Sequence, residues 1–215
     1  MTTFVPPVVA WRGEDDGTRP LVVLLHGRGS DETDIIALAD HLPAGSVYAA
    51  LRAPIAEGGG YAWFANRGIG RPVAASLSDT MAWFRSWLDQ VAPPGRPVIL
   101  VGFSGGAAFA GGLILDDPSR YAGAAILYGT LPFDAGVPTT PHRLSGTAVL
   151  VVHGDADIVI PRALLERTWT YLHGDASATT TGFRDPGGHG LSPAALGELR
   201  RWLGALLPAQ QKVIQ

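Results

Sequence analysis

The sequence predicts an α/β protein in which a mostly parallel central sheet carries helices on both faces. Apolar segments of strand length alternate with segments whose apolar residues have helical spacing, and this alternation is typical of parallel sheets. Some strand segments, such as 21–25 and 148–152, are apolar at every position, as expected of strands buried on both faces. No repeat or linker divides the chain, so we expect one domain over residues 1–215.

The composition indicates a globular protein and argues against several functional classes. Of the 215 residues, 47% are hydrophobic and 16% are charged, and the formal net charge is -3. The chain contains no cluster of Lys and Arg, so we expect no binding of nucleic acid. It has no cysteine, which excludes disulfides and thiol nucleophiles. Neither a signal peptide nor an apolar run of membrane-spanning length is visible, so we expect a cytoplasmic protein without a membrane span.

The chain begins with two apolar runs, at 5–11 and 21–25, which are separated by a charged turn containing glycine. We expect these two runs to form a hairpin. A helix through 35–42 should follow, because its apolar residues have helical spacing and Ser30 or Asp31 can serve as its N-cap.

A loop at 58–64 is rich in glycine and aromatic residues, which suits contact with a substrate. The clearest amphipathic helix lies at 76–91 and is stopped by two prolines and a glycine. The remaining segments fit the same alternation of strands and helices: strands at 47–53, 97–101, 123–128, 148–152 and 179–183, and helices at 107–115, 161–172 and 193–206.

A nucleophile elbow is predicted where the strand from Pro97 runs into Gly102-Phe103-Ser104-Gly105-Gly106. This segment fits the pattern Gly-x-Ser-x-Gly, and a helical segment rich in small residues follows it. A serine on a sharp strand-to-helix turn adopts a strained backbone conformation, and neighbours with a Cβ atom would collide there. Because the chain holds 28 glycines, the pattern alone could arise by chance, and other parts of the sequence have to support it.

A serine nucleophile needs a base that removes its proton and an acid that orients the base. His189 follows the last expected strand, and Asp157 follows the strand before it. The resulting order Ser, Asp, His along the chain is the order of α/β-hydrolases. We therefore predict Ser104 as the nucleophile, His189 as the base, and an aspartate of the loop at 155–157 as the acid.

The residues alone leave two aspartates open as the acid, because Asp155 and Asp157 lie on one short loop. Asp134 and Asp185 are more distant alternatives, which we interpret as turn or surface carboxylates. Among the other histidines, those that end a strand before a glycine are expected to be structural and bonded to the backbone: His26 and His153.

The tetrahedral intermediate of acyl transfer needs hydrogen-bond donors directed at its oxyanion. One predicted donor is the backbone N–H of Gly105, at the start of the elbow helix. The second should come from the loop after the early His-Gly strand, where the backbone N–H of Arg28 is best placed. This prediction concerns the backbone of Arg28 and not its side chain.

These segments resemble the phospholipase/carboxylesterase family of α/β-hydrolases, which includes small bacterial carboxylesterases and acyl-protein thioesterases. The segments similar to the family's oxyanion loop, aromatic loop and elbow are Leu25-His26-Gly27-Arg28-Gly29, Ala62-Trp63-Phe64 and Gly102-Phe103-Ser104. Segment 153–161 resembles the family's acid loop and implies Asp157 as the acid, and Gly188-His189 matches its catalytic histidine. The resemblance covers nearly the whole chain and implies an α/β-hydrolase fold that works without a cofactor or metal.

One position departs from the family. Many members carry Gln directly after the nucleophile, whereas this chain has Gly105. The backbone donor is retained, but any contact made by a glutamine side chain is missing. The resemblance therefore gives weaker support for a particular substrate class of the family, such as palmitoylated protein or lysophospholipid. No insertion between the elbow and the acid is long enough for a cap domain, so we expect an open site.

The sequence thus predicts a carboxylesterase that cleaves small to medium acyl esters through an acyl-enzyme on Ser104. Alternatives are a thioesterase, lysophospholipase or peptidase on the same scaffold, and a catalytically silent hydrolase-fold binding module. An apolar rim around the site would suit either a homodimer contact or a lipid-facing surface. The apolar residues expected to form pocket walls, which could equally be ordinary core, are Trp63, Phe64, Leu131, Ile158 and Leu191.

Overall fold

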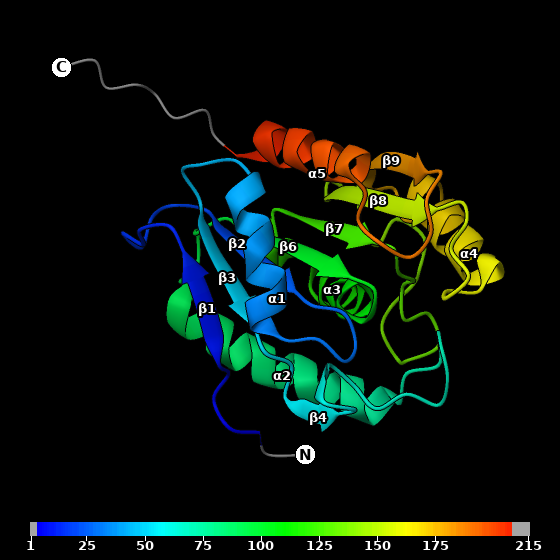
Figure 1. The fold of residues 1–215 in the computed structure, drawn as a ribbon, viewed down its shortest axis with the longest axis horizontal. Coiled ribbons are helices and arrows are strands. Elements are labelled where there is room, and N and C mark those ends of the chain that lie inside the picture. Colours follow the sequence, from blue (N-terminus) through cyan, green and yellow to red (C-terminus); the bar gives the residue numbers. More distant parts are fainter. Residues whose placement is uncertain (1–3, 208–215) are drawn as a thin grey trace.

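Seven strands form one sheet, in the order β1-β3-β2-β6-β7-β8-β9 (Figure 1). A computed structural model describes residues 4–207 of the chain. β1 pairs antiparallel with β3, and every other neighbouring pair in this sheet is parallel. The strands are β1 (Val9–Arg12), β2 (Leu21–Leu25), β3 (Val47–Leu51), β6 (Val98–Phe103), β7 (Gly123–Leu127), β8 (Ala148–Gly154) and β9 (Thr179–Asp185).

Helices cover both faces of this sheet, as the sequence predicts. In Figure 1, α1 lies in front of the sheet and α3 lies behind it. Successive side chains of a strand point to opposite faces, so Val23 of β2 belongs to one core and Leu24 to the other. Helices α2 (Ala74–Val91), α3 (Gly105–Asp116) and α4 (Arg162–His173) pack on one face, and α1 (Glu32–Ile36) and α5 (Pro193–Leu206) on the other.

The predicted helix at 35–42 forms as two short pieces. Asp31 caps α1, since its side chain accepts hydrogen bonds from the backbone N–H groups of Thr33 and Asp34. A 3₁₀ helix, η1 (Ala37–His41), continues from α1. A second one, η2 (Pro118–Arg120), leads from α3 into β7.

The expected opening hairpin is wrong. β1 pairs with β3, with Val9 opposite Leu51, and does not pair with β2. Both edges of β2 are occupied, because Leu21 lies opposite Val47 of β3 on one side and opposite Val98 of β6 on the other. The charged turn therefore connects two strands that are separated by another strand.

The glycine-rich loop also differs from the expectation, because it contains a short hairpin, β4 (Ile55–Glu57) and β5 (Gly60–Ala62). Gly58 and Gly59 form its turn with φ angles of 60° and 87°, which favour glycine. The hairpin packs against the loop after β2, where the Gly29 N–H donates to the Tyr61 carbonyl at 2.9 Å. This contact fixes the position of the Arg28 loop.

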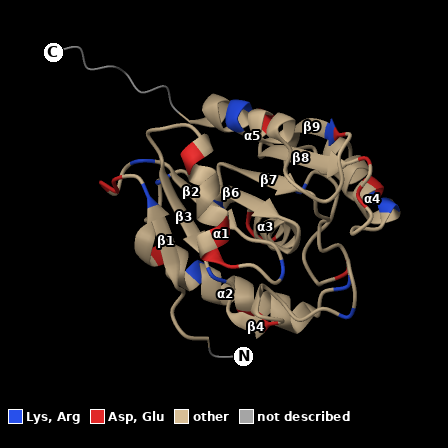
Figure 2. Cartoon of the chain, in the orientation of Figure 1, with Lys and Arg blue, Asp and Glu red and all other residues tan. Residues whose placement is uncertain are grey.

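In Figure 2, charged residues of both signs are scattered over loops, helices and the ends of some strands. The central strands β6 and β7 carry none. Within residues 4–207, no helix is both long and apolar enough to cross a membrane.

Two histidines are buried at the ends of parallel strands. The His26 ring bonds to the backbone on both sides, with Nδ1 2.7 Å from the Gly27 carbonyl and Nε2 accepting from the Ala53 N–H at 3.0 Å. The Nε2 atom of His153 is buried without a hydrogen-bond partner, and the His153 ring packs against Trp169. Burial, together with the nearby positive charge of Arg184, lowers the pKa of His153 to about 4.

His153 should make the protein less stable in mild acid. The unfolded chain takes up a proton at this ring below about pH 6.5, whereas the folded protein does so only near pH 4, so acidification favours unfolding. From these two pKa values we expect His153 to lower the free energy of unfolding by about 2 kcal/mol between pH 7 and pH 5. Urea unfolding of wild type and His153→Phe at both pH values measures this difference.

The exposed His41 provides the matched control, because His41→Phe should keep the wild-type loss between pH 7 and pH 5. An equal loss of stability in wild type and His153→Phe would contradict the prediction.

Candidate active site

Ser104 lies on a strained turn between β6 and α3. Its φ and ψ angles are 54° and -113°, in a region that residues with side chains rarely adopt. Glycines make the turn possible, since a Cβ atom on Gly102 would lie 2.2 Å from the Gly106 carbonyl oxygen, and one on Gly106 would lie 2.1 Å from the Leu25 carbonyl oxygen. The Ser104 N–H donates to the Leu127 carbonyl at 2.9 Å. The backbone around the hydroxyl is therefore tightly held.

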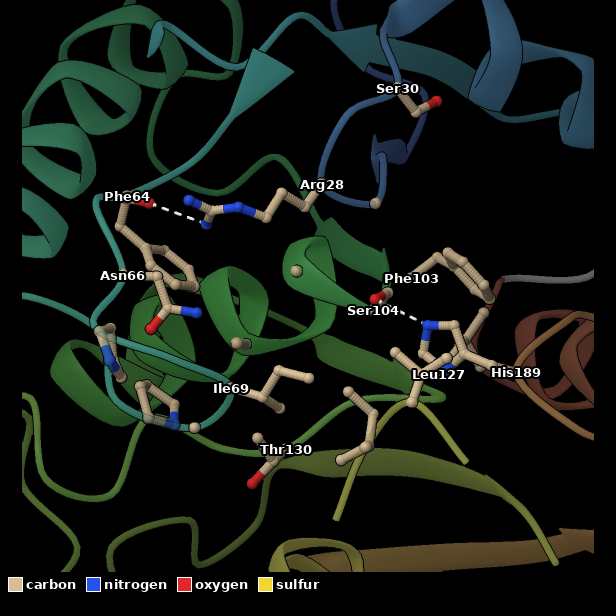
Figure 3. A pocket seen from close by; sticks show the side chains of 18 of the residues that line it. Arg28, Ser30, Phe64, Asn66, Ile69, Phe103, Ser104, Leu127, Thr130 and His189 are labelled. Carbon is tan, nitrogen blue, oxygen red and sulfur yellow. Dashed lines mark hydrogen bonds between the residues drawn. The ribbon is translucent and has the colours of Figure 1, made fainter. Parts of the chain in front are cut away.

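A continuous hydrogen-bonded chain joins three side chains from three loops. The Nε2 atom of His189 lies 2.9 Å from Ser104 Oγ (Figure 3), and its Nδ1 atom lies 2.8 Å from Asp157 Oδ2. The three loops follow β6, β8 and β9, and the parallel strands bring them to one edge of the sheet. This arrangement can pass a proton from the serine hydroxyl to an imidazole whose far nitrogen faces a carboxylate.

The Asp157 carboxylate is fully buried and ionised. Burial alone would raise its pKa, but hydrogen bonds from His189 and from the N–H groups of Ile160 and Val159 outweigh burial and hold the pKa below its usual value. The two amide bonds measure 3.0 and 2.8 Å. Asp155 instead forms an exposed ion pair with Arg184 at 2.7 Å, so the structure brings Asp157 and not Asp155 to the imidazole.

The imidazole of His189 is also flanked by two aromatic rings. The ring centroids of Phe103 and Tyr128 lie 5.4 and 6.4 Å from that of His189. Below these rings, the Tyr128 hydroxyl donates to the carboxylate of Asp185. Asp185 is only 2% exposed, so its interpretation as a turn or surface carboxylate is wrong. It is the last residue of β9, and its buried carboxylate is surrounded by hydrogen-bond donors.

The loop after β2 and the turn after β6 lie close together beside the cavity. A Cβ atom on Gly105 would lie 3.3 Å from the backbone nitrogen of Arg28, so these two backbone segments approach closely. Neither the Arg28 nor the Gly105 N–H has an acceptor among residues 4–207, and both residues line the cavity. The Arg28 side chain turns away from Ser104, pairs with Glu57, and donates to the Phe64 carbonyl at 3.3 Å (Figure 3).

Beside Ser104 and His189 lies a cavity of about 570 Å³, which is within the usual size range of small-molecule sites. In Figure 3, Phe64, Asn66 and Ile69 lie on the side opposite Ser104 and His189. Three of the five residues expected as pocket walls line this cavity: Phe64, Leu131 and Leu191.

The other two expected wall residues lie elsewhere, which corrects the sequence interpretation. Trp63 is buried in the core, where it stacks on Phe109 and its indole N–H donates to the His26 carbonyl at 2.8 Å. Ile158 is 96% exposed, and its neighbours Val159 and Ile160 line the cavity in its place.

Further lining residues were missed from the sequence. Two of them belong to the apolar residues with helical spacing after Asp31, and this spacing could have indicated them: Ile35 and Leu38. Asn66 had no such signal, because it lies in an irregular segment between β5 and α2. Its Oδ1 atom is buried without a hydrogen-bond partner, so the Asn66 amide is a polar group in a mostly apolar wall.

Within residues 4–207, no group of three or more His, Cys, Asp or Glu side chains is arranged to hold a metal ion. The polar groups that converge beside Ser104 are those of the hydrogen-bonded chain and the two backbone amides.

Comparisons with known proteins bear on the family and the fold of this chain. A model of the phospholipase/carboxylesterase family matches residues 11–205. The chain is 25% identical over 187 residues to MhqD of Bacillus subtilis (strain 168), covering 85% of this chain and 91% of that protein. Solved carboxylesterases share the fold: one from Bacillus cereus (TM-score 0.82, 21% identity, 94% of this chain and 95% of that one) and one from Mesorhizobium loti (0.77, 27%, 87% and 89%). The chain belongs to the phospholipase/carboxylesterase family of hydrolases, and its residues 4–207 have the α/β-hydrolase fold without a cap domain.

Proposed function

We propose that this hydrolase is a cytoplasmic carboxylesterase that cleaves small to medium acyl esters through an acyl-enzyme on Ser104. The observation that carries the proposal is the continuous chain Ser104–His189–Asp157, whose serine end opens into a cavity of about 570 Å³. Ser104, His189 and Asp157 are then the nucleophile, the general base and the acid that orients the base.

In the acylation step, the Ser104 oxygen attacks the ester carbonyl carbon while His189 Nε2 takes the hydroxyl proton. The carbonyl oxygen becomes an oxyanion, which the N–H groups of Arg28 and Gly105 stabilise by hydrogen bonds. One such donor contributes about 3 kcal/mol to the stability of the transition state. The intermediate collapses when the C–O bond to the alcohol breaks, and His189 returns the proton to the leaving oxygen.

In the deacylation step, water takes the place of the alcohol. His189 removes a proton from this water, the resulting hydroxide attacks the acyl carbon, and Ser104 leaves with the proton that His189 then gives back. The buried carboxylate of Asp157 holds the imidazole in the tautomer that accepts a proton at Nε2 during both steps. Every proton taken from a nucleophile is returned to a leaving group, so no other reactant is needed.

A small or medium acyl group is favoured by the size and chemistry of the cavity. Its walls are mostly apolar and come from α1, the segment after β5, and the loops after β7 and β8. Apolar walls bind the acyl chain by excluding water, which contributes about 0.8 kcal/mol per buried methylene group. Wild-type specificity should therefore depend on how many carbons the cavity can hold.

Replacement of Ser104 by alanine should abolish turnover. We expect kcat on p-nitrophenyl butyrate to fall by about 10⁴- to 10⁶-fold, because no other group can form the acyl-enzyme. Labelling by a fluorophosphonate probe, followed by mass spectrometry, should modify wild type at Ser104 and leave Ser104→Ala unmodified. The control Ser119→Ala, which changes a serine in η2, should label like wild type. Labelling that persists in Ser104→Ala would overturn the assignment of the nucleophile, and a folded wild type that does not react would favour the silent binding module.

Replacement of each aspartate of the acid loop by asparagine should separate the two. Asp157→Asn should lower kcat by about 10³- to 10⁴-fold, since an amide no longer fixes the imidazole tautomer or stabilises the imidazolium. Asp155→Asn should change kcat by less than about threefold, because it removes only an exposed ion pair with Arg184. Steady-state kinetics on one ester measure both values. Loss of turnover in Asp155→Asn alone would reject Asp157 as the acid.

The acyl chain preference should follow the cavity. On p-nitrophenyl esters, kcat/KM should rise by about fourfold per added methylene from acetate until the cavity is full, and then fall. Ala108 lies in the wall of the cavity, and Ala108→Leu fills part of it, so this variant should reach its maximum at a shorter chain. A profile with no dependence on chain length in wild type would contradict acyl binding in this cavity.

The same assay distinguishes the enzymatic alternatives. Matched acyl thioesters, lysophospholipids and peptide anilides share the acyl site and differ in the leaving group. If the proposal is correct, oxyesters have the highest kcat/KM. A higher value for thioesters or lysophospholipids would identify the corresponding alternative.

A further inference from the structure

The loop that carries His189 is rich in glycine and is held by bonds to neighbouring segments, such as the bond from the Ala156 N–H to the Gly187 carbonyl at 3.0 Å. Its sequence is Asp185-Pro186-Gly187-Gly188-His189-Gly190, and glycines leave a loop conformationally free. The imidazole nevertheless has to meet Ser104 Oγ at 2.9 Å and Asp157 Oδ2 at 2.8 Å at the same time. A general base works only when it is held within about 0.5 Å of its productive position. Some part of the surrounding structure must therefore fix this loop.

The buried carboxylate of Asp185 is bonded to the first part of this loop. Its Oδ1 atom accepts a hydrogen bond from the Gly187 N–H at 3.0 Å, at the start of the loop. Ser192, which follows the loop and caps α5, helps to hold the pKa of this carboxylate below its usual value. Its Oδ2 atom accepts from the Tyr128 hydroxyl. Asp185 is 2% exposed, so these donors take the place of water around the charge.

Tyr128 connects this carboxylate to the imidazole. It follows β7, is completely buried, and has a φ angle of 49°, a left-handed conformation that costs a tyrosine free energy. Its N–H donates to the Val152 carbonyl at 2.8 Å, which fixes the backbone between β7 and β8. The ring meets the His189 ring edge to face, at 79° and a centroid distance of 6.4 Å.

These contacts form a closed circuit from His189 through the Tyr128 ring and hydroxyl to Asp185, and from Asp185 through Gly187 back to His189. We infer that Tyr128 and Asp185 are positioning residues, which hold the imidazole of His189 against Ser104. Neither residue touches the reacting atoms, so both act through His189. The inference rests on the proposed function, because it assigns to the circuit the task of aligning a general base.

The test uses full-length protein and replaces the two partners singly and together. Tyr128→Phe keeps the ring and removes only the hydroxyl, and Asp185→Ala removes the carboxylate. We expect each change to lower kcat, and also the rate constant for fluorophosphonate labelling of Ser104, by about 10- to 100-fold, with KM changed less than about twofold. Because both changes break the same circuit, the double variant should be no less active than the less active of the two single variants. Tyr121→Phe, which removes a buried hydroxyl without a partner between η2 and β7, at the opposite end of β7 from Tyr128, should label at the wild-type rate.

A purely structural role would give different results. If the pair only stabilised the fold, the melting temperature would fall while the labelling rate of the folded fraction stayed at the wild-type value, and this would overturn the inference. So would losses that multiply in the double variant, or a loss from Tyr128→Phe that persists undiminished in a His189→Ala background. If Asp185→Ala does not fold, Tyr128→Phe alone carries the test in both backgrounds. A wild type that does not label at all would reject the proposed function itself, so the two failures remain distinguishable.

Discussion

The close backbone packing of β2, β6 and α3 is the constraint on which the site depends. Carbonyl oxygens occupy the places where Cβ atoms of Gly102 and Gly106 would otherwise lie, at 2.2 and 2.1 Å. Only glycine at these positions lets the helix begin directly above the strand. Ser104 is consequently lifted above the carboxyl edge of the sheet with a φ angle of 54°, a strain of about 1–3 kcal/mol. The fully buried strands on either side, β2 and β7, hold this conformation.

Once the serine is fixed at that edge, the other groups have to reach it from more distant strands. β8 and β9 lie two and three places from β6 in the sheet, so their loops must return across the edge. The loop after β8 does so as a tight turn, in which the amides of Val159 and Ile160 bond to the Asp157 carboxylate. The loop after β9 is rich in glycine and depends on buried polar partners for its shape, most directly on Asp185. The position of the His189 imidazole therefore depends on the buried groups behind its loop, Asp185 and Tyr128.

The sequence was informative wherever a local pattern determines the structure. Apolar strands, the glycines around Ser104 and the order of polar strand ends are local features, and from them the fold class was predicted and is confirmed. Long-range choices were not readable: β1 pairs with β3 because both edges of β2 are taken, and no local pattern records this. The same limit explains why the positions of Trp63 and Asp185 were predicted wrongly. Both side chains are buried by long-range packing, which no local pattern in the sequence shows.

Gly105 shows how the catalytic chemistry and the choice of substrate are separated in this molecule. A side chain at this position would begin 3.3 Å from the Arg28 nitrogen, so glycine leaves room for the two backbone segments that supply the proposed oxyanion donors. Backbone segments held by glycines and parallel strands thus position the proposed oxyanion donors. A large part of the cavity wall consists instead of side chains from irregular segments, including Phe64, Asn66 and Val159. Substitutions there can change the acyl group without moving Ser104 or His189, and we infer that specificity is encoded in these segments.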